Sequence, residues 1–138
     1  MVRAHAAQSP VTRTLGFWLA VPLAVLQAFN AVRAVADPVG FSAYMGAPLQ
    51  TAVDSAWVLI YALRTGFIAL LVAQLLLRRD LEALKWTALV ALIMPLGDAF
   101  IAHQAGAASV IVARHGAIAA YLLVVTVALF WSARGRAR

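Results

Sequence analysis

The sequence predicts an all-α integral membrane protein, a four-transmembrane-helix bundle whose spans run up, down, up and down. First, 64% of the 138 residues are hydrophobic and only 12% are charged, whereas soluble domains are about 45–50% apolar and about 25% charged. Second, four apolar runs are long enough to cross a hydrocarbon core of about 30 Å. Third, the basic residues gather on one side of these runs. We assign residues 1–138 to a single membrane domain with spans at about 15–36, 55–77, 81–103 and 114–132.

The span boundaries follow from local signals. The first span ends at Asp37-Pro38, because a residue before proline disfavours the helical region. Asp54 or Ser55 can cap the second span, and Asp80 can cap the third after the tight Arg78-Arg79 turn. After span 1, residues 39–54 carry aromatic residues at helical spacing, which predicts a short amphipathic helix on the bundle or at the membrane interface.

The basic residues predict the orientation. The connections 37–54 and 104–113 contain no Lys or Arg. Cytoplasmic loops carry the excess of these residues, so both termini are expected to be cytoplasmic. Because membrane orientation accounts for the net charge of +6, that charge gives no reason to expect a nucleic-acid partner. The residues that carry the signal are Arg3, Arg13, Arg78, Arg79, Lys85, Arg134, Arg136 and Arg138.

Arg64 stands near the middle of the second span. Without a partner in hydrocarbon, its charge costs about 3 to 15 kcal/mol, depending on the method of measurement. Asp98 is the acidic residue well inside a span, at nearly the same depth when 1.5 Å is counted per helical residue. Because spans 2 and 3 are joined by a short turn, we expect an intramembrane Arg64–Asp98 ion pair. Such a pair either fixes the packing of the spans or belongs to a site.

Further polar residues converge on the outer half of the bundle, whereas the inner half is nearly all Leu, Val, Ile and Ala. This asymmetry predicts a net-positive pocket that opens toward the outer face and is closed below by an apolar plug. Transport would need an inward polar path, which a single chain does not offer. The candidate ligand-binding residues are Asn30, Arg33, Tyr61, Arg64, Asp98, His103, Arg114, His115 and Tyr121.

Alternatives stand beside several of these assignments. Arg33 and Arg114 lie near enough to the rim to reach lipid head groups. The residue types of a two-His-one-carboxylate metal site are present in His103, His115 and Asp98. We expect no metal, because Asp98 and His103 do not share a helix face and nearby arginines would repel a cation. The sequence indicates no particular cofactor.

Small residues recur three or four positions apart on two spans. Ala62, Gly66, Ala69 and Ala73 form such a stripe on span 2, and Gly116 and Ala120 repeat the spacing on span 4. These stripes let helices approach closely. They indicate either packing within the bundle or a homo-oligomer interface.

Four short motifs resemble a known family. They are DPVGFSAYMGAP (37–48), LRTGF (63–67), PLGDAF (95–100) and RHG (114–116). The chain is similar from Leu15 to Trp131 to small bacterial four-span membrane proteins, catalogued as a domain of unknown function in the broad DoxX-like neighbourhood. The resemblance implies a four-helix fold in the bacterial inner membrane and draws attention to Arg64, Asp98 and His115. For some DoxX-like relatives it implies quinone-linked oxidation.

Two functions are therefore expected. In the first, the pocket binds an amphiphile such as a quinone, an isoprenoid or a lipid. If chemistry occurs, Arg64 and Tyr121 would polarise an oxygen, while Asp98 or His115 would move a proton. In the second, the protein is a non-enzymatic accessory or scaffold subunit whose Arg–Asp cluster is structural. The sequence does not decide whether the protein is an enzyme.

Overall fold

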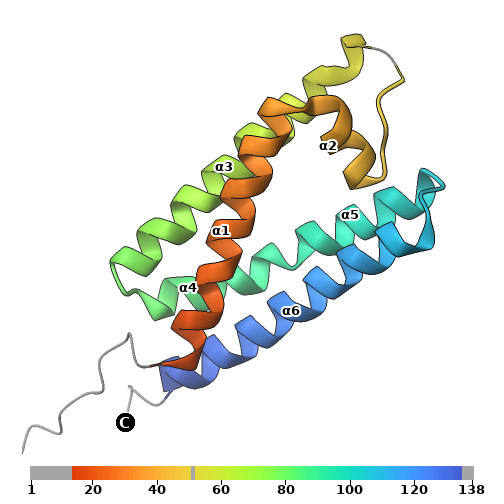
Figure 1. Ribbon diagram of the computed structural model, residues 1–138. Coiled ribbons are helices and arrows are strands. Elements are labelled where there is room, and N and C mark those ends of the chain that lie inside the picture. The colour runs from red at the N-terminus through yellow and green to blue at the C-terminus, as the bar shows by residue number, and fades with distance from the viewer. Residues whose placement is uncertain (1–13, 51, 135–138) are drawn as a thin grey trace, which may run out of the picture.

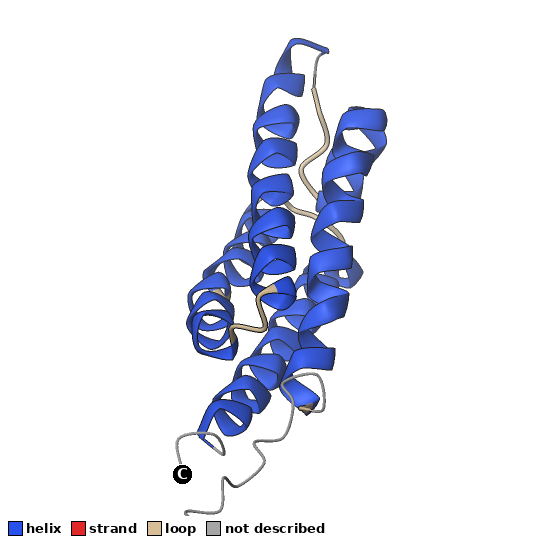
Figure 2. Ribbon diagram, turned by 90° about the vertical axis from the view of Figure 1, so that its left-hand side faces the viewer, coloured by secondary structure: helices blue, strands red, loops and turns tan. Residues whose placement is uncertain are grey.

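The computed structural model describes residues 14–50 and 52–134, and its regular structure there is entirely helical (Figure 2). Four helical segments are long and apolar enough to cross a membrane, which confirms the predicted fold class. The orientation stays a prediction, since Arg3, Arg13, Arg136 and Arg138 lie outside the described residues. The four segments are Leu15–Ala36, Ala56–Leu77, Leu81–Gln104 and Ser109–Arg134.

The first span is helix α1 (Leu15–Ala36), which continues past Pro22 and ends at Asp37, as predicted. Asp37 then caps the short helix α2 (Pro38–Met45), because its Oδ1 atom accepts a hydrogen bond of 2.9 Å from the Gly40 amide. Gly46 ends α2 in the left-handed conformation, with φ of 85°. Helix α2 is the short helix expected after span 1, but it is apolar nearly all round rather than amphipathic. It lies on the bundle, since Phe41 is fully buried.

The second span is α3 (Ala56–Leu77), which follows a 3-10 turn over Ala52–Ser55. Ser55 occupies its N-cap position but makes no capping bond with its side chain. The turn after α3 places Arg79 at a φ of 56°. Asp80 caps the next helix, as predicted, by accepting a 2.9 Å hydrogen bond from the Ala83 amide.

The third span is divided into α4 (Leu81–Ala91) and α5 (Ile93–Gln104). The sequence predicts one helix here, and the break at Leu92 has a local cause. Pro95 has no N–H group for the Ala91 carbonyl, and its ring crowds that carbonyl. The next bond of the ladder, from the Leu96 amide to the Leu92 carbonyl, is long at 3.4 Å.

The fourth span is α6 (Ser109–Arg134), which starts five residues before the predicted position 114. The small residues of 104–113 suggested a loop, but after Gly106 the segment contains no glycine or proline to interrupt a helix. Gly106 itself has φ of 71° and turns the chain between α5 and α6.

The helices form two groups that diverge toward one end (Figure 1). Helix α1 packs mainly against α3 and also against α6, while α5 packs against α6. Helix α4 contacts both α3 and α6. Span 3 thus leaves the turn beside α3 as α4 and separates from α3 as α5, which follows α6.

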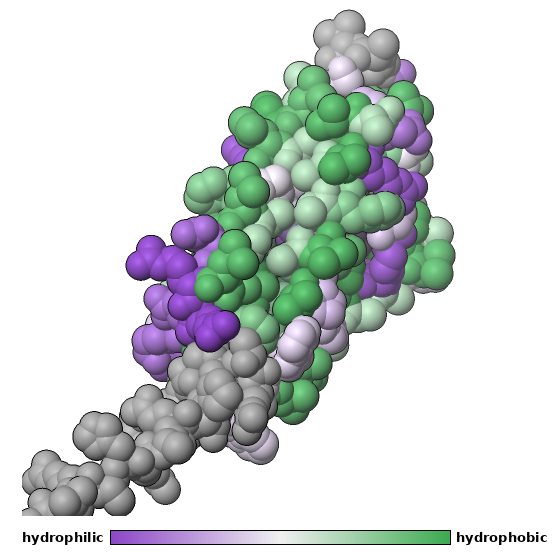
Figure 3. Space-filling model, turned by 60° about the vertical axis from the view of Figure 1, so that its left-hand side comes forward, coloured by the Kyte–Doolittle hydropathy of each residue, from purple (hydrophilic) through white to green (hydrophobic). Residues whose placement is uncertain are grey.

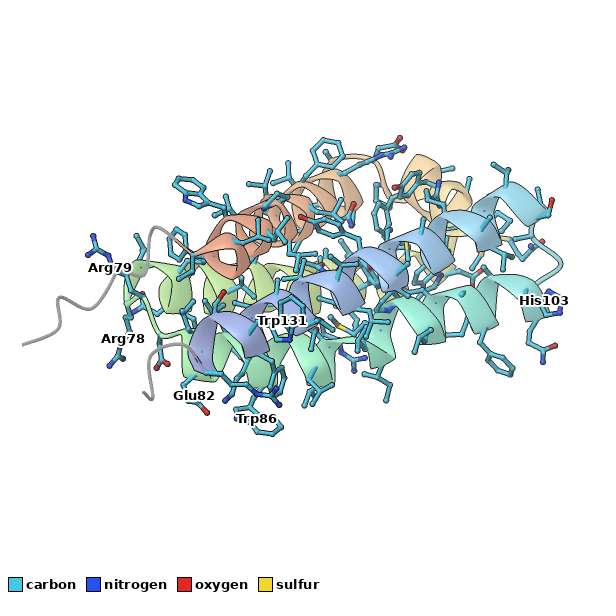
Figure 4. All side chains as sticks on the ribbon, turned by 90° about the horizontal axis from the view of Figure 1, so that it is seen from below. Arg78, Arg79, Glu82, Trp86, His103 and Trp131 are labelled. Atoms are coloured by element: carbon cyan, nitrogen blue, oxygen red, sulfur yellow. The ribbon has the colours of Figure 1, made fainter. Side chains whose placement is uncertain are left out.

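The two ends of the bundle differ in charge. Arg78, Arg79, Glu82, Trp86 and Trp131 gather at one end, which we call the basic end, and His103 lies at the other, the α2 end (Figure 4). At the basic end, Lys85 pairs with Glu82 at 2.6 Å. Its Nζ atom also lies 5.5 and 5.1 Å from the ring centroids of Trp86 and Phe130. Hydrophobic side chains cover the middle of the face in Figure 3, as a lipid-facing surface requires.

The stripe of small residues on span 2 is used within the chain. Ala62 and Ala69 are buried, and a Cβ added to Gly66 would lie 3.6 Å from the Cβ of Ala31 on α1. On span 4, Gly116 and Ala120 are exposed. A homo-oligomer stays a prediction. Because the span 2 stripe is packed within the chain, its interface would be formed by the exposed stripe on span 4.

Replacing Asp80 by alanine is expected to lower the free energy of unfolding by about 1 kcal/mol, because the Ala83 amide loses its cap. The matched control is Glu82→Ala. Its ion pair with Lys85, in which the Glu82 side chain is 66% exposed, contributes about 0–1 kcal/mol. Thermal unfolding in detergent, followed by circular dichroism, compares the two variants. Equal melting temperatures would show that the cap is not stabilising.

Candidate functional site

A cavity of about 360 Å³ lies inside the bundle, and residues from all six α-helices line it. Toward the α2 end its wall includes polar and charged side chains. Toward the basic end the wall is apolar and merges with a packed cluster of leucines, valines and alanines. The apolar wall includes Val72, Leu84, Leu122, Val125 and Leu129. The uneven distribution of polar residues along the spans therefore corresponds to one cavity with a polar end and an apolar end.

Five of the nine candidate residues line this cavity. They come from four different helices, so the fold brings together residues that are as many as 85 positions apart (115 minus 30). The side chains of Asn30 and His115 are buried, with 7% and 3% exposed. Asn30 Oδ1 is buried without a hydrogen-bond partner among the described residues. The five are Asn30, Tyr61, Arg64, Asp98 and His115.

The predicted Arg64–Asp98 ion pair is wrong, because the structure places no such pair within 4.0 Å among its described residues. The prediction assumed that spans 2 and 3 stay side by side along their length. After the break at Leu92, α5 instead packs on α6, and Asp98 moves away from α3. Arg64 is exposed and Asp98 is half-buried, and both still line the cavity.

Arg33 and Arg114 stand outside the cavity lining and hold Tyr44 between them. The two guanidinium carbons lie 4.4 and 3.6 Å from the centre of the Tyr44 ring. Arg114 also donates a hydrogen bond to the backbone carbonyl of Tyr44. Cation–π contacts of this kind contribute about 0.5–2 kcal/mol each. These arginines therefore fix α2 on the bundle.

The last two candidates are also absent from the cavity lining. The Tyr121 hydroxyl donates a 2.8 Å hydrogen bond to the Leu19 carbonyl and so ties α6 to α1. His103 is exposed at the end of α5 (Figure 4). Tyr121 thus has a structural partner, and His103 does not contribute to the cavity wall.

These positions change the charge expected for the site. The sequence predicted a net-positive pocket from Arg33, Arg64 and Arg114 against Asp98. Of these residues, only Arg64 and Asp98 line the cavity, so their formal charges balance. Such a wall suits a head group that accepts a hydrogen bond on one side and donates one on the other.

At the α2 end, helix α2 itself lines the cavity, which the prediction of an outward-opening pocket did not include. Tyr44 and Met45 of α2 line it from that side. The Met45 carbonyl lies 3.3 Å from His115 Nε2, and both residues are buried. Helix α2 therefore covers the end of the cavity, and the two arginines on Tyr44 hold it there.

Several lining residues were not among the candidates. Gln27 and Thr65 form a hydrogen bond between α1 and α3, and Thr87 of α4 and Met94 of α5 contribute to the wall. The sequence places Gln27 on one face of span 1 with Asn30, one turn along the same helix, although it was not one of the nine candidates. Thr87 and Met94 give no comparable signal in the sequence.

No group of three or more His, Cys, Asp or Glu side chains that could hold a metal ion occurs in the part of the chain that the structure describes. Around this one cavity, Asp98 instead offers a hydrogen-bond acceptor and Arg64 offers donors. His115 adds an imidazole ring. This set can orient a polar head group and could exchange a proton with it.

The family model for a domain of unknown function, DUF4267, matches residues 24–129. The chain belongs to the DUF4267 family. The matched segment runs from the middle of α1 to the end of the packed core on α6 and includes all five candidate residues that line the cavity. No curated protein and no solved structure matches the chain.

Proposed function

We propose that this DUF4267 protein binds an amphiphile, such as a quinone, an isoprenoid or a lipid, in the cavity of its membrane bundle. The observation that carries the proposal is the division of the cavity into a polar end and an apolar end. Its volume of about 360 Å³ lies in the range of about 300–1,000 Å³ that is common for ligand sites.

The head group would lie among Asn30, Arg64 and Asp98. Arg64 offers several N–H donors, while Asp98 and Asn30 Oδ1 offer acceptors. The unpartnered Asn30 oxygen supports this assignment, because a buried polar atom without a hydrogen bond costs about 1–3 kcal/mol. The hydrocarbon chain would extend along Leu122 and Val125 toward the basic end.

Any chemistry on the head group would fall to Asp98 and His115. Both line the cavity, and both can exchange a proton. Tyr121 has no part in this proposal, since its hydroxyl is bonded to the Leu19 carbonyl. The site lies in a bundle that we place in the bacterial inner membrane with both termini in the cytoplasm, on the basis of the basic end.

Replacing Arg64 by methionine is expected to weaken binding about 10- to 100-fold, since a hydrogen bond to a charged group contributes about 1.5–3 kcal/mol. Arg78→Met is the matched control, because Arg78 is exposed at the basic end and does not line the cavity. The amphiphiles retained by each purified protein are measured by mass spectrometry, and thermal shifts with added amphiphiles give affinities.

The wild type and Arg78→Met are expected to retain the same amphiphile and Arg64→Met to lose it. If none of the three proteins retains or responds to an amphiphile, the proposal is wrong. The accessory-subunit hypothesis then gains support, in a modified form. Its structural ties would be the Gln27–Thr65 bond and the arginines on Tyr44 rather than an Arg64–Asp98 pair.

A further inference from the structure

The cavity has a mouth on one side of the bundle. Of its lining residues, all of which are described, three are exposed and the others are buried or half-buried. The three are Arg64 on α3 and Ile93 and Ile101 on α5, the last two 72% and 58% exposed. Helix α5, which follows α4, diverges from α3 toward the α2 end (Figure 1). The mouth therefore lies between α3 and α5.

Both ends of the cavity are closed to water. At the α2 end, Phe41 and Met45 are buried and α2 is tied to α6 through Arg114 and His115. At the basic end, the packed cluster that includes Leu76, Leu81 and Leu129 forms the floor. A ligand therefore has no route along the bundle axis.

The mouth faces the hydrocarbon layer. Its two flanking helices belong to membrane spans, and the large side chains beside it are apolar and exposed. These are Leu63, Phe67, Leu96 and Phe100, which are between 57% and 78% exposed. A molecule that reaches the cavity through this mouth must already be dissolved in the bilayer.

The depth of the mouth restricts the head group. Arg64 is eight residues from the first residue of α3, and Asp98 is six residues from the last residue of α5. At 1.5 Å per residue these positions lie about 12 and 9 Å along the helices from the α2 end. A phosphate head group stays in the interfacial layer outside the hydrocarbon core. A small uncharged ring or chain end with carbonyl or hydroxyl oxygens can enter to this depth.

From these observations we infer that the cavity is loaded sideways from the bilayer, through the mouth between α3 and α5, by an amphiphile with a small uncharged oxygen-bearing head group. Arg64 meets the head group at the mouth and donates to its oxygen. Asp98 accepts from a hydroxyl on the opposite side. This inference rests on the proposed function and narrows its ligand to one class.

The chain contains no cysteine, so a single introduced thiol can be modified after folding. Gly97→Cys places it at the mouth, and Gly116→Cys places it on the exposed face of α6 as the matched control. A Cβ added to either glycine meets no atom within 4 Å, so both variants should fold. Benzyl methanethiosulfonate then adds a bulky group to the thiol, and dithiothreitol removes it again.

The probe is a quinone whose ten-carbon chain ends in a photoreactive diazirine, added to the reconstituted protein and cross-linked by light. Cross-links are mapped by peptide mass spectrometry to the buried wall around Leu122 and Val125. The benzyl group on Gly97→Cys is expected to lower this cross-linking at least about tenfold, and dithiothreitol to restore it. The same group on Gly116→Cys should leave it unchanged.

Unchanged cross-linking in benzylated Gly97→Cys would overturn sideways loading, while amphiphile binding itself would stand. A phospholipid with a photoreactive chain end is the second probe. If it cross-links to the buried wall and the quinone does not, the inferred head group is wrong. If neither probe labels that wall in the wild type, the proposed function fails as well.

Discussion

Replacing Phe41 by alanine is expected to lower the free energy of unfolding by about 3–5 kcal/mol, the usual cost of emptying a buried phenylalanine site. Phe41 is fully buried, and its ring lies 5.3 Å from the Tyr61 ring and 6.1 Å from the Tyr44 ring. It is the largest fully buried side chain of α2. Its loss should loosen the cover over the cavity as well as reduce stability.

Phe67→Ala provides the control for this change. It removes the same group from α3, where the ring is 66% exposed on the lipid-facing surface. Thermal unfolding in detergent compares the stabilities, and hydrogen exchange of the α2 amides reports whether the cover opens. If Phe41→Ala melts like Phe67→Ala and keeps its α2 amides protected, the ring does not anchor α2.

Replacing Gly16 by alanine is expected to destabilise the bundle by about 1–3 kcal/mol, because a Cβ atom there overpacks the contact between α1 and α6. That atom would lie 2.9 Å from the Cα atom of Leu129 and 3.0 Å from the backbone of Ala128. Backbone atoms cannot rotate aside, so the helices must separate. Separation would also lengthen the 3.4 Å bond from the Gly16 amide to Ser132 Oγ.

The opposite sign is expected for Gly66→Ala. Its new Cβ would meet Ala31 at an ordinary 3.6 Å, and alanine stabilises a helix interior by about 0.5–1 kcal/mol relative to glycine. Equilibrium unfolding of the two variants and the wild type in mixed micelles gives both values. Equal effects of the two substitutions would contradict the close α1–α6 contact.

Local signals in the sequence were sufficient for the membrane fold. The end of α1 at Asp37 and the start of α4 at Asp80 are each determined by a residue and its nearest neighbours. The polar residues on several spans also predicted a shared site, and five of the nine candidates line one cavity; three of the others have different partners and His103 is exposed. Such features can be predicted from the sequence because they depend on nearby residues and not on the positions of the other helices.

The tertiary contacts could not be read in this way. Pro95 predicts a disturbed helix but not the direction in which α5 leaves, which is decided by packing on α6. Arg114 has its partner seventy residues away, in the ring and carbonyl of Tyr44. An equal depth in the membrane therefore suggested a pair between Arg64 and Asp98 that the bundle geometry does not allow.

The break in the third span has a consequence for the polarity of the cavity wall. Because Pro95 cannot donate, the carbonyl oxygen of Ala91 lacks the amide that an unbroken helix would give it. Ala91 and Pro95 both belong to the cavity lining. In a bilayer, a backbone oxygen released by proline is tolerated where another group or an ordered water satisfies it. The main chain thus adds an acceptor to the cavity wall that no side-chain inventory would include, and a bound molecule need not be polar at its head alone.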